Sequence, residues 1–495
     1  MHNSKVLNLL KTFTKDEFRE FGLFVESPFY NRESVIIRLY KILKEYYPEF
    51  ESISLQKKSV FSKLYPHKHY NDAFLRNTIS DLLGLAEKYL KNIQSASDPF
   101  NGQYLLLKEL TNRKQQVLFK MNYKKAEKIL KSSEVRDEIY YHNKFLLEDE
   151  LRRNVVVNSS RILFKDDNIE DQAKSLHIQH LTENIKLYAI MLNQKKFTFD
   201  HKFDFSLLEV MTCYLEKNYH TYSNIPYITI FYNCVMLFKT EEKKYFDELK
   251  SELKKHYKEL SVIDRKNMFM VLTNHSNLQI KTGRYEFCRE SFEIYREFIR
   301  TKAYYEGNDF MAHYIYRSAA YSALDVKEFE WAEKFINKHR ADVHIDFRDS
   351  SFNFCYSQLY LLRGEYDKAL ESLSKVQTFD FKDKQSVNQT LLQIYFCKNE
   401  TESFISLVDS FRHFLKRNDK VRKLDFKMLN NFITYIKRLY GIKSGSIKID
   451  KSDLNILKKE LEKNNEVASR KWLLERIDEL LNQEKPHKSR TNMTF

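Results

Sequence analysis

The amino-acid sequence predicts an all-α protein, and two observations carry that prediction. Glycine and proline are scarce: the 495 residues contain 8 Gly and 6 Pro, and no Pro stands between Pro226 and Pro486. Sheet proteins need many turn residues, so this scarcity favours helices. Apolar residues also recur at helical spacing, most clearly in the stretch from Phe352 to Val376.

That stretch predicts two short helices folded against each other. Gly364 ends the first helix, because Gly readily takes the positive φ that a helix C-terminus favours. Ser357 and Ala369 lie one on each helix, and small side chains so placed let the two backbones approach closely. The apolar stripes are Phe352, Tyr356, Leu359 and Leu362 on the first helix and Tyr366, Ala369, Leu370, Leu373 and Val376 on the second.

The stretch resembles the tetratricopeptide (TPR) repeat, a helical hairpin with a period of about 34 residues. The family's two small residues, its turn Gly, the aromatic after it and the large second-helix residue are matched by Ser357, Ala369, Gly364, Tyr366 and Leu373. Two positions depart from the family pattern. Asn353 stands where the first helix usually has Trp, and Phe381 stands at the terminal Pro.

The same frame fits three other stretches. One copy has Ser276, Gly283, Tyr285, Cys288 and Phe292, and another has Ala320, Lys327 at the turn, Phe329, Ala332 and Ile336. A fainter copy has Tyr123, Ala126 and Leu130, with Lys114 where a small residue belongs. The resemblance implies a TPR-like α-solenoid of helical hairpins, and an irregular all-helical domain is the alternative.

Residues 1–98 form a separate predicted helical domain. Thr14 and Glu17 make a capping box at the start of one helix, which breaks at Ser27-Pro28. Three amphipathic helices are then expected at Ser34–Tyr47, Leu55–Tyr65 and about Asn71–Ile93.

Residues 55–90 resemble the end of the DNA-binding domain in bacterial regulators that pair a winged helix with TPR-like repeats. The resemblance implies a helix-turn-helix-like unit whose second helix enters the major groove. Its expected base contacts are Arg76, Asn77 and Ser80, and its expected phosphate contacts are Lys68, His69 and Lys88. The alternative is a structural cap on the solenoid, which the acidic Asp81 and Glu87 on the same helix favour.

Breaks at Ser95–Gly102, Ser223–Pro226 and Gly441–Asp450 divide the rest of the chain. We expect irregular helical hairpins over 99–222, TPR-like repeats over 223–440 and C-terminal capping helices over 441–484. Residues 485–495 are polar and are expected to form a disordered tail.

The sequence lacks the common motifs of catalysis. No Gly is followed by Lys, so there is no phosphate-binding P-loop, and GxGxxG, GxSxG and HExxH are also missing. We therefore expect no enzyme activity, no cofactor and no metal site. Five scattered cysteines without a CxxC pair are typical of a reducing cytosol, and no apolar run is long enough for a membrane helix. These features predict a cytoplasmic protein that does not bind membranes. The N-terminal pattern, including SPFYN at Ser27–Asn31, resembles the start of uncharacterised bacterial helical proteins, which implies a protein of bacterial type.

The net charge is +15, from 83 basic and 68 acidic residues. Solvated helix faces in a Lys-rich chain explain this excess, and attraction to nucleic acid is the alternative.

The TPR resemblance also implies a function, because TPR proteins commonly bind peptides on the concave face formed by their first helices. We therefore expect a non-catalytic scaffold that binds a protein or peptide partner. A DNA-binding transcription regulator with a TPR-like sensing domain is the alternative. The positions that match the family's groove are Asn274, Asn277, Lys281, Arg317, Tyr321 and Gln358.

Overall fold

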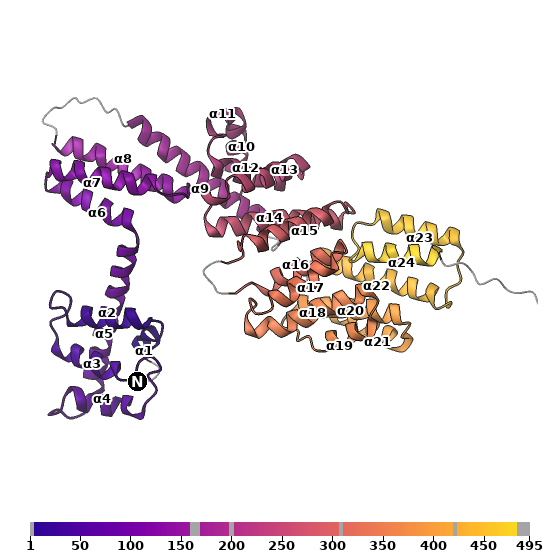
Figure 1. Cartoon of the computed structure of the whole chain (residues 1–495), viewed down its shortest axis with the longest axis horizontal. Coiled ribbons are helices and arrows are strands. Elements are labelled where there is room, and N and C mark those ends of the chain that lie inside the picture. Colours follow the sequence, from indigo (N-terminus) through magenta and orange to yellow (C-terminus); the bar gives the residue numbers. More distant parts are fainter. Residues whose placement is uncertain (1–3, 159–168, 198–201, 306–309, 419–422, 483–495) are drawn as a thin grey trace, which may run out of the picture. The chain divides into compact units, whose positions relative to one another are not determined.

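The structure is a computed structural model that describes residues 4–158, 169–197, 202–305, 310–418 and 423–482 (Figure 1). Over these ranges the chain forms 24 α-helices and two short 3-10 helices, with no strand, so the all-α prediction is confirmed. The predicted tail at 485–495 lies outside the described residues. None of the described helices combines the length and the apolar character that crossing a bilayer requires.

The chain divides into two compact units. Unit 1 comprises residues 1–134 and 138–180, and unit 2 comprises residues 135–137 and 181–495. The boundary at residue 180 falls inside α9 (Ile169–Phe197). The finer division expected from the sequence, with boundaries near residues 98, 222 and 440, stays a prediction.

Unit 1 contains the four helices expected from the sequence between Thr14 and Ile93, preceded by α1 (Lys5–Leu10), which was not predicted. The capping box is present, since the Thr14 hydroxyl accepts from the Glu17 N–H and the Glu17 carboxylate accepts from the Thr14 N–H. The side chain of Asn71 caps the long fifth helix. The helices are α1 (Lys5–Leu10), α2 (Lys15–Glu26), α3 (Ser34–Lys44), η1 (Ile53–Leu55), α4 (Lys57–Leu64), α5 (Asp72–Ser97), α6 (Pro99–Asn112), α7 (Gln116–Lys131) and α8 (Glu138–Asn158).

Aromatic rings build the core of α1 to α5. Phe18, Phe21 and Tyr40 are buried together, and the Tyr40 hydroxyl donates to the Phe18 carbonyl at 2.9 Å. A Cβ at Gly22 would collide with the Tyr40 ring, so glycine is what lets α2 and α3 approach this closely. A second core lies among α6, α7 and α8, where α8 packs against both of the other helices.

Unit 2 continues with pairs of antiparallel helices. Its helices after α9 are α10 (Ser206–Lys217), α11 (Tyr219–Tyr222), α12 (Pro226–Thr240), α13 (Lys243–Lys255), η2 (Tyr257–Glu259), α14 (Val262–Lys281), α15 (Phe287–Arg300), α16 (His313–Asp325), α17 (Phe329–Lys338), α18 (Ile345–Arg363), α19 (Tyr366–Ser374), α20 (Phe381–Lys398), α21 (Thr401–Lys416), α22 (Lys423–Lys443), α23 (Lys451–Lys463) and α24 (Arg470–Asn482). From α12 to α21 each helix packs against the next, and the first helices α16, α18 and α20 also contact one another.

Five hairpins of the chain share one turn. In each, the first or second residue after the first helix has a positive φ, and the N–H of the residue that follows it donates to the carbonyl five positions before that donor. This is the Schellman arrangement, which satisfies carbonyls at the end of the helix. The φ angles are 54° at Lys114, 93° at Gly283, 63° at Lys327, 80° at Gly364 and 61° at Asn399.

The shared turn also fixes which residues lie between the two helices of a hairpin. The three small pairs expected from the sequence are buried in this position, which confirms them: Ser276 with Cys288, Ala320 with Ala332, and Ser357 with Ala369. In the hairpins that turn at Lys114 and Asn399 the equivalent buried pairs are larger: Leu107 with Phe119, and Leu392 with Phe404. Small side chains are therefore one solution to this packing, and a Leu–Phe pair is another.

The faint repeat copy around Ala126 was placed in the wrong register. The sequence frame put Lys114 inside the first helix, whereas the structure puts it at the turn between α6 and α7. The error arises because Lys114 takes the left-handed conformation without being glycine, so no glycine marks the turn in the sequence.

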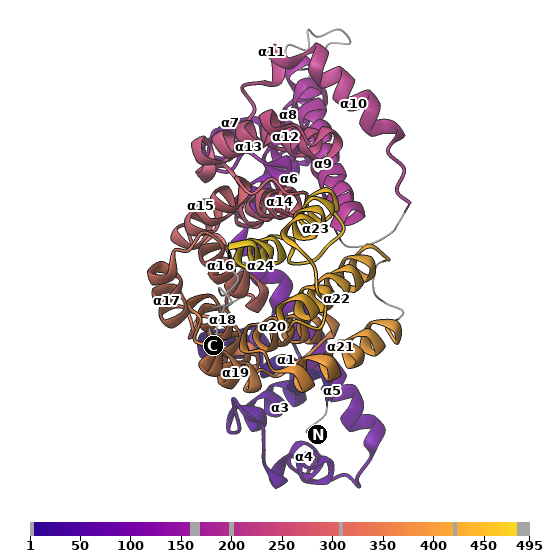
Figure 2. The same cartoon turned by 90° about the vertical axis from the view of Figure 1, so that its right-hand side faces the viewer.

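The last helices close unit 2. α22, α23 and α24 share one core with α20 and α21, which includes Leu429, Leu457 and Leu473. Figure 2 shows α24 beside α16, the first helix of one hairpin. α24 also reaches residues far earlier in the chain, since its Lys471 donates to Asp325.

Candidate binding site

Six residues expected to line a groove lie on three first helices of unit 2. The exposed side chains are those of Asn277 and Lys281 on α14 and Tyr321 on α16, and Tyr321 is 53% exposed. Asn274 is half-buried on the same face of α14. The remaining two, Arg317 and Gln358, are occupied by contacts within the chain.

Arg317 is part of a buried brace across three hairpins. Its guanidinium on α16 forms an ion pair with Asp383 on α20, and the two side chains are 12% and 9% exposed. The guanidinium also donates to the hydroxyls of Ser351 at 3.2 Å and Ser350 at 3.4 Å on α18, and it lies 5.1 Å from the centroid of the Phe354 ring. Five directional donors suit Arg to such a junction. Its predicted role in a peptide groove is replaced by a structural role.

Gln358 is likewise used inside the protein. Its side chain is 8% exposed, and its amide donates to the Thr390 hydroxyl on α20 at 2.7 Å. This hydrogen bond joins α18 to α20. It also gives the buried amide the partner that a buried polar group needs. A ligand could reach Gln358 only by breaking this contact, so this residue also leaves the predicted groove.

The chain's own α24 lies against the inner helices of the stack. Near its start, Lys471 donates to the Asp325 carboxylate at 2.7 Å and to the Asp325 carbonyl at 2.8 Å at the end of α16. Trp472 meets the Phe396 ring of α20 edge-on, with centroids 5.4 Å apart. The Ser469 hydroxyl just before α24 accepts from Gln389 of α20. α24 therefore touches both ends of the series α16 to α20 (Figure 2).

The Lys471 contact has a third member. Cys288 of α15 places its Sγ 3.8 Å from the Lys471 Nζ. Burial raises the pKa of the Cys288 thiol to about 12, and the nearby Asp325 adds to this. Burial lowers the pKa of Lys471, but the hydrogen bond and charge of Asp325 outweigh this and raise it above its ordinary value. The thiol is therefore neutral at pH 7, and the lysine and aspartate are a charged pair.

Arg470 makes the closest approach of α24 to the turn between α14 and α15. A Cβ at Gly283 would collide with the guanidinium of Arg470, which is 5% exposed. The same guanidinium donates to the side-chain oxygen of Asn465 at 2.6 Å. Glycine therefore suits position 283 for two reasons: it takes the φ of 93° without strain, and it leaves room for the Arg470 guanidinium.

We call Asn274, Asn277, Lys281 and Tyr321 the inner strip. The three α14 residues recur at helical spacing on one face, and Tyr321 precedes Asp325 by one turn of α16. These side chains are the part of the predicted groove that α24 and the internal braces leave accessible. Amide, ammonium and phenol groups can donate to carbonyls or carboxylates of an extended chain.

Beneath the inner strip lies a buried histidine. His275 is 3% exposed and stands between the rings of Phe246 and Phe287, at centroid distances of 5.3 and 5.7 Å. Burial lowers the pKa of His275 to about 4, and the positive charges of Lys196 and Arg284 act in the same direction. The ring is therefore neutral at pH 7 and packs as an apolar group.

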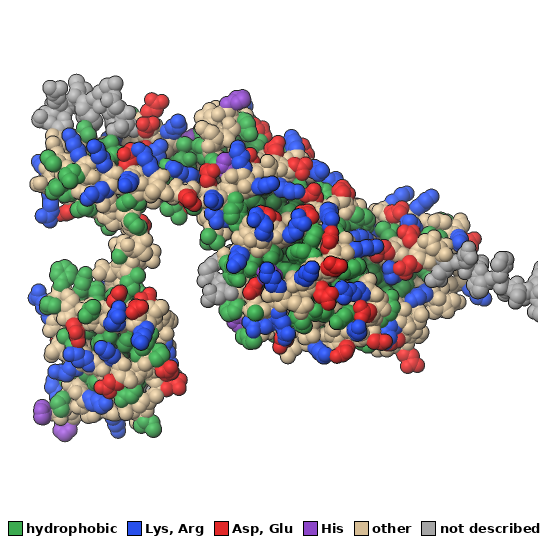
Figure 3. All heavy atoms as spheres, viewed as in Figure 1, with side chains coloured by type: hydrophobic (Ala, Val, Ile, Leu, Met, Phe, Trp, Pro, Cys, Tyr) green, Lys and Arg blue, Asp and Glu red, His purple; other side chains and the backbone are tan. Residues whose placement is uncertain are grey.

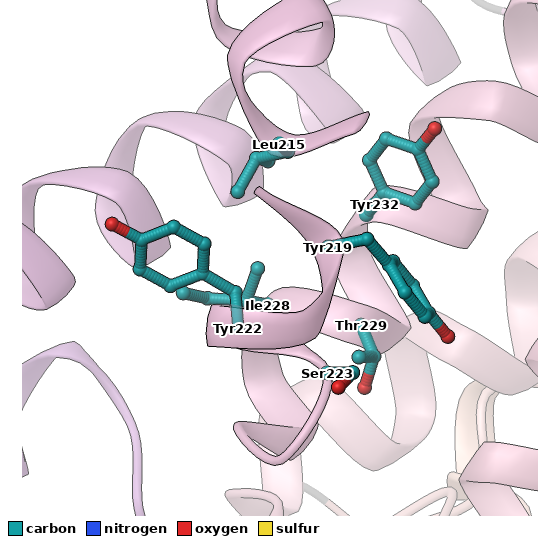
Figure 4. A pocket seen from close by; sticks show the side chains of 7 residues that line it. All are labelled: Leu215, Tyr219, Tyr222, Ser223, Ile228, Thr229 and Tyr232. Carbon is teal, nitrogen blue, oxygen red and sulfur yellow. The ribbon is translucent and has the colours of Figure 1, made fainter. Parts of the chain in front are cut away.

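Two hollows in the described part of the structure lie away from the residues of the inner strip. One small cavity of about 10 Å³ lies between α10, α11 and α12, and Figure 4 shows the side chains of Tyr219, Tyr222 and Tyr232 around it. This volume is about that of one water molecule, too small for a substrate. A more open hollow of about 500 Å³ is lined by Ser410, His413, Phe414, Arg417 and Asn418 at the end of α21, next to residues 419–422, which lie outside the described ranges.

No group of three or more His, Cys, Asp or Glu residues stands close enough in the described ranges to hold an ion.

The six residues expected to contact DNA are all exposed on or before α5 of unit 1. Two already have partners there. Arg76 pairs with Asp72 at 3.0 Å, and the Lys68 ammonium lies 5.2 Å from the centroid of the Phe74 ring. His69, Asn77, Ser80 and Lys88 share the exposed surface with the acidic Asp81 and Glu87.

The fold of unit 2 is a series of helical hairpins whose inner strip presents polar side chains beside α24. Across the visible face of α12 to α24, Lys and Arg alternate with Asp and Glu, as Figure 3 shows. Comparison with protein-family models, with curated proteins and with solved structures finds no match to this chain.

Sequence reasoning missed the residues that attach α24 to the stack. Lys471 and Asp325 are far apart in the chain, and nothing in either local pattern signals that they meet. The run Ser469–Trp472 does place two cations before a tryptophan at the start of a helix, an arrangement suited to docking on another surface.

Proposed function

We propose that this chain is a non-catalytic scaffold of the bacterial cytoplasm that binds a protein or peptide through the inner strip. The observation that carries the proposal is the accessibility of Asn277, Lys281 and Tyr321 on the first helices α14 and α16. The TPR resemblance supports the same surface, since that family binds peptides on its first helices.

The mechanism is recognition by a preformed surface. α14 and α16 are held by their neighbours, and α16 also by α24, so the backbone that carries the inner strip is ordered before a partner arrives. Because this surface is already ordered, less conformational entropy is lost when a partner binds. The amide of Asn277 and the ammonium of Lys281 would donate to the partner's backbone or carboxylates, and the Tyr321 ring would cover its apolar groups.

Site-specific photocrosslinking in the native cell tests this proposal. A photoreactive phenylalanine analogue at position 277 or 321 is expected to give a discrete crosslinked species. The control places the analogue at Lys334, which is exposed on the second helix α17. Crosslinks of equal yield at all three positions, or none at 277 and 321, would contradict the proposal.

The second candidate, a DNA-binding regulator, is favoured by the exposure of all six predicted contacts around α5. Phosphate contacts make binding fall steeply as salt rises. A gel-shift series with duplex DNA should then show binding at low salt that weakens in Lys88→Ala. No shift at low salt would remove this candidate.

A further inference from the structure

The hairpin of α6 and α7 in unit 1 has one covered and one uncovered face. On the covered face, Leu107 and Phe119 are buried together with Leu147 of α8. On the other, Leu106 is 41% exposed, Val117 74%, Leu118 47% and Met121 56%. Four large apolar side chains at such exposure on neighbouring helices form a patch that ordinary surfaces rarely carry.

Lysines lie along the same side of α7. Positions 117, 121, 124 and 128 follow one another at intervals of three or four, so they share a face of α7, and Lys114 stands at the turn just before that helix. We call this surface the α7 face and define it by Leu106, Lys114, Val117, Leu118, Met121, Lys124, Lys125 and Lys128. It is turned away from the buried Phe119, Ala126 and Leu130.

The charge of the α7 face is not neutralised within the described part of the chain. Lys114, Lys124, Lys125 and Lys128 are exposed and form no ion pair there. The two acidic residues of the hairpin are already paired: Glu109 with Arg113 at 2.6 Å, and Glu127 with Lys131 at 2.8 Å. In Figure 3 the visible surface around α7 carries mainly basic and hydrophobic side chains.

We propose that the α7 face binds an acidic amphipathic helix of a partner protein. A helix is the expected shape, because α8 already packs along both helices of this hairpin on its other face. The apolar side of the partner would cover Val117, Leu118 and Met121, and its carboxylates would meet the lysines. Methionine suits such a surface, since its flexible side chain adapts to different partners.

Charge excludes a second copy of the same face as the occupant, because a symmetric contact would bring lysines against lysines. A lipid surface is a less suitable occupant, because interfacial helices usually present Trp or Phe among their apolar residues and the α7 face has none. This surface is separate from the inner strip, so the two proposals can fail independently.

Fluorescence anisotropy with the full chain tests the proposal. The probe is a fluorescein-labelled amphipathic peptide with Leu at the core positions of each heptad and Glu at the flanking positions. We expect the peptide to bind, and the charge reversal K124E/K125E to weaken binding by about tenfold or more. V117S/M121S should weaken it similarly, because it removes the apolar contact.

Four controls separate this contact from general effects. K334E/K338E changes the net charge equally on α17 of unit 2 and should leave binding unchanged. Circular dichroism should show unchanged helix content in each variant, and the same peptide with Lys in place of Glu should not bind. Asn277→Ala should also have no effect, which keeps this test distinct from that of the inner strip.

Several outcomes would overturn the proposal. The acidic peptide could give no change in anisotropy, or the Lys peptide could bind as tightly as the acidic peptide. The acidic peptide could also bind K124E/K125E as tightly as it binds the unchanged chain. Binding to phosphatidylserine vesicles that V117S/M121S abolishes, without peptide binding, would assign the surface to lipid. A dimer in sedimentation that V117S/M121S dissociates would assign it to a second copy.

Discussion

At the scale of single residues, the hairpin turns are set by backbone conformation more than by residue type. The five equivalent turns hold two glycines, two lysines and one asparagine, all with positive φ. A side chain in this conformation costs roughly 1–2 kcal/mol, which glycine avoids. The lysine and asparagine turns are therefore strained, and the packing of each hairpin has to compensate for that strain.

Replacing Lys327 by Gly should accordingly stabilise unit 2. The expected gain in the free energy of unfolding is about 0.5–1 kcal/mol, because relief of strain exceeds the added entropy of the unfolded chain. Urea unfolding followed by tryptophan fluorescence measures this, since both tryptophans, Trp331 and Trp472, lie in unit 2.

Two matched variants accompany this measurement. Gly364→Ala should destabilise by about 1 kcal/mol, because it puts a Cβ on a residue with φ of 80°. Lys334→Gly, in the middle of α17, should also destabilise by about 1 kcal/mol, because glycine weakens a helix interior. A destabilised Lys327→Gly would contradict the assignment of the turn.

His275 gives unit 2 a pH dependence of known sign. Its pKa is about 4 when folded, below the ordinary 6.5. Between these values the unfolded chain binds the proton and the folded chain does not, so the free energy of unfolding falls as pH falls from 6.5 toward 4. The full loss is on the order of 3 kcal/mol.

The variant His275→Phe isolates this contribution, because it keeps a ring between Phe246 and Phe287 and removes the titrating group. Urea midpoints measured from pH 7 to pH 5 should fall further in the unchanged chain than in the variant. Parallel curves would show that His275 titrates normally in the folded state.

At the scale of elements, buried polar braces join the first helices of successive hairpins. The pair Arg317–Asp383 ties α16 to α20, and the serines of α18 complete it. Removing one member of a buried pair leaves the other charge without compensation, which costs about 3–5 kcal/mol.

A double-mutant cycle measures this brace. Arg317→Met should destabilise unit 2 by about 3 kcal/mol, and adding Asp383→Asn should recover part of that loss, because the uncompensated charge is gone. Arg317→Lys keeps the positive charge but loses the hydrogen bonds to both serines. Its free energy of unfolding should therefore lie between those of the unchanged chain and Arg317→Met. Additive single and double effects would mean that the two side chains do not interact.

At the scale of the whole molecule, the sequence predicts local structure better than long-range contacts. The capping box at Thr14, the turn at Gly364 and the buried pair Ser357–Ala369 follow from residue types within one or two helices. The turns at Lys114 and Asn399 could not be found the same way, because their residues are not glycine and their buried pairs are Leu and Phe.

The candidate site was predictable only in part for the same reason. Tyr321 and Asn277 are exposed as a groove residue must be, but Arg317 and Gln358 face partners from the next hairpins. No local pattern reveals that Asp383 or Thr390 stands opposite. The position of α24 beside the stack depends on contacts such as Lys471–Asp325, which join residues 146 positions apart.

The central structural claim is that α24 folds back onto the stack and so defines which part of the inner face stays open. Zero-length carbodiimide crosslinking followed by mass spectrometry tests it directly, because the Lys471 Nζ and the Asp325 carboxylate are 2.7 Å apart. Lys398 and Asp367, 2.6 Å apart between α20 and α19, provide the positive control. We predict an isopeptide link between Lys471 and Asp325 that is absent in Lys471→Ala; recovery of the Lys398–Asp367 link alone would contradict the claim.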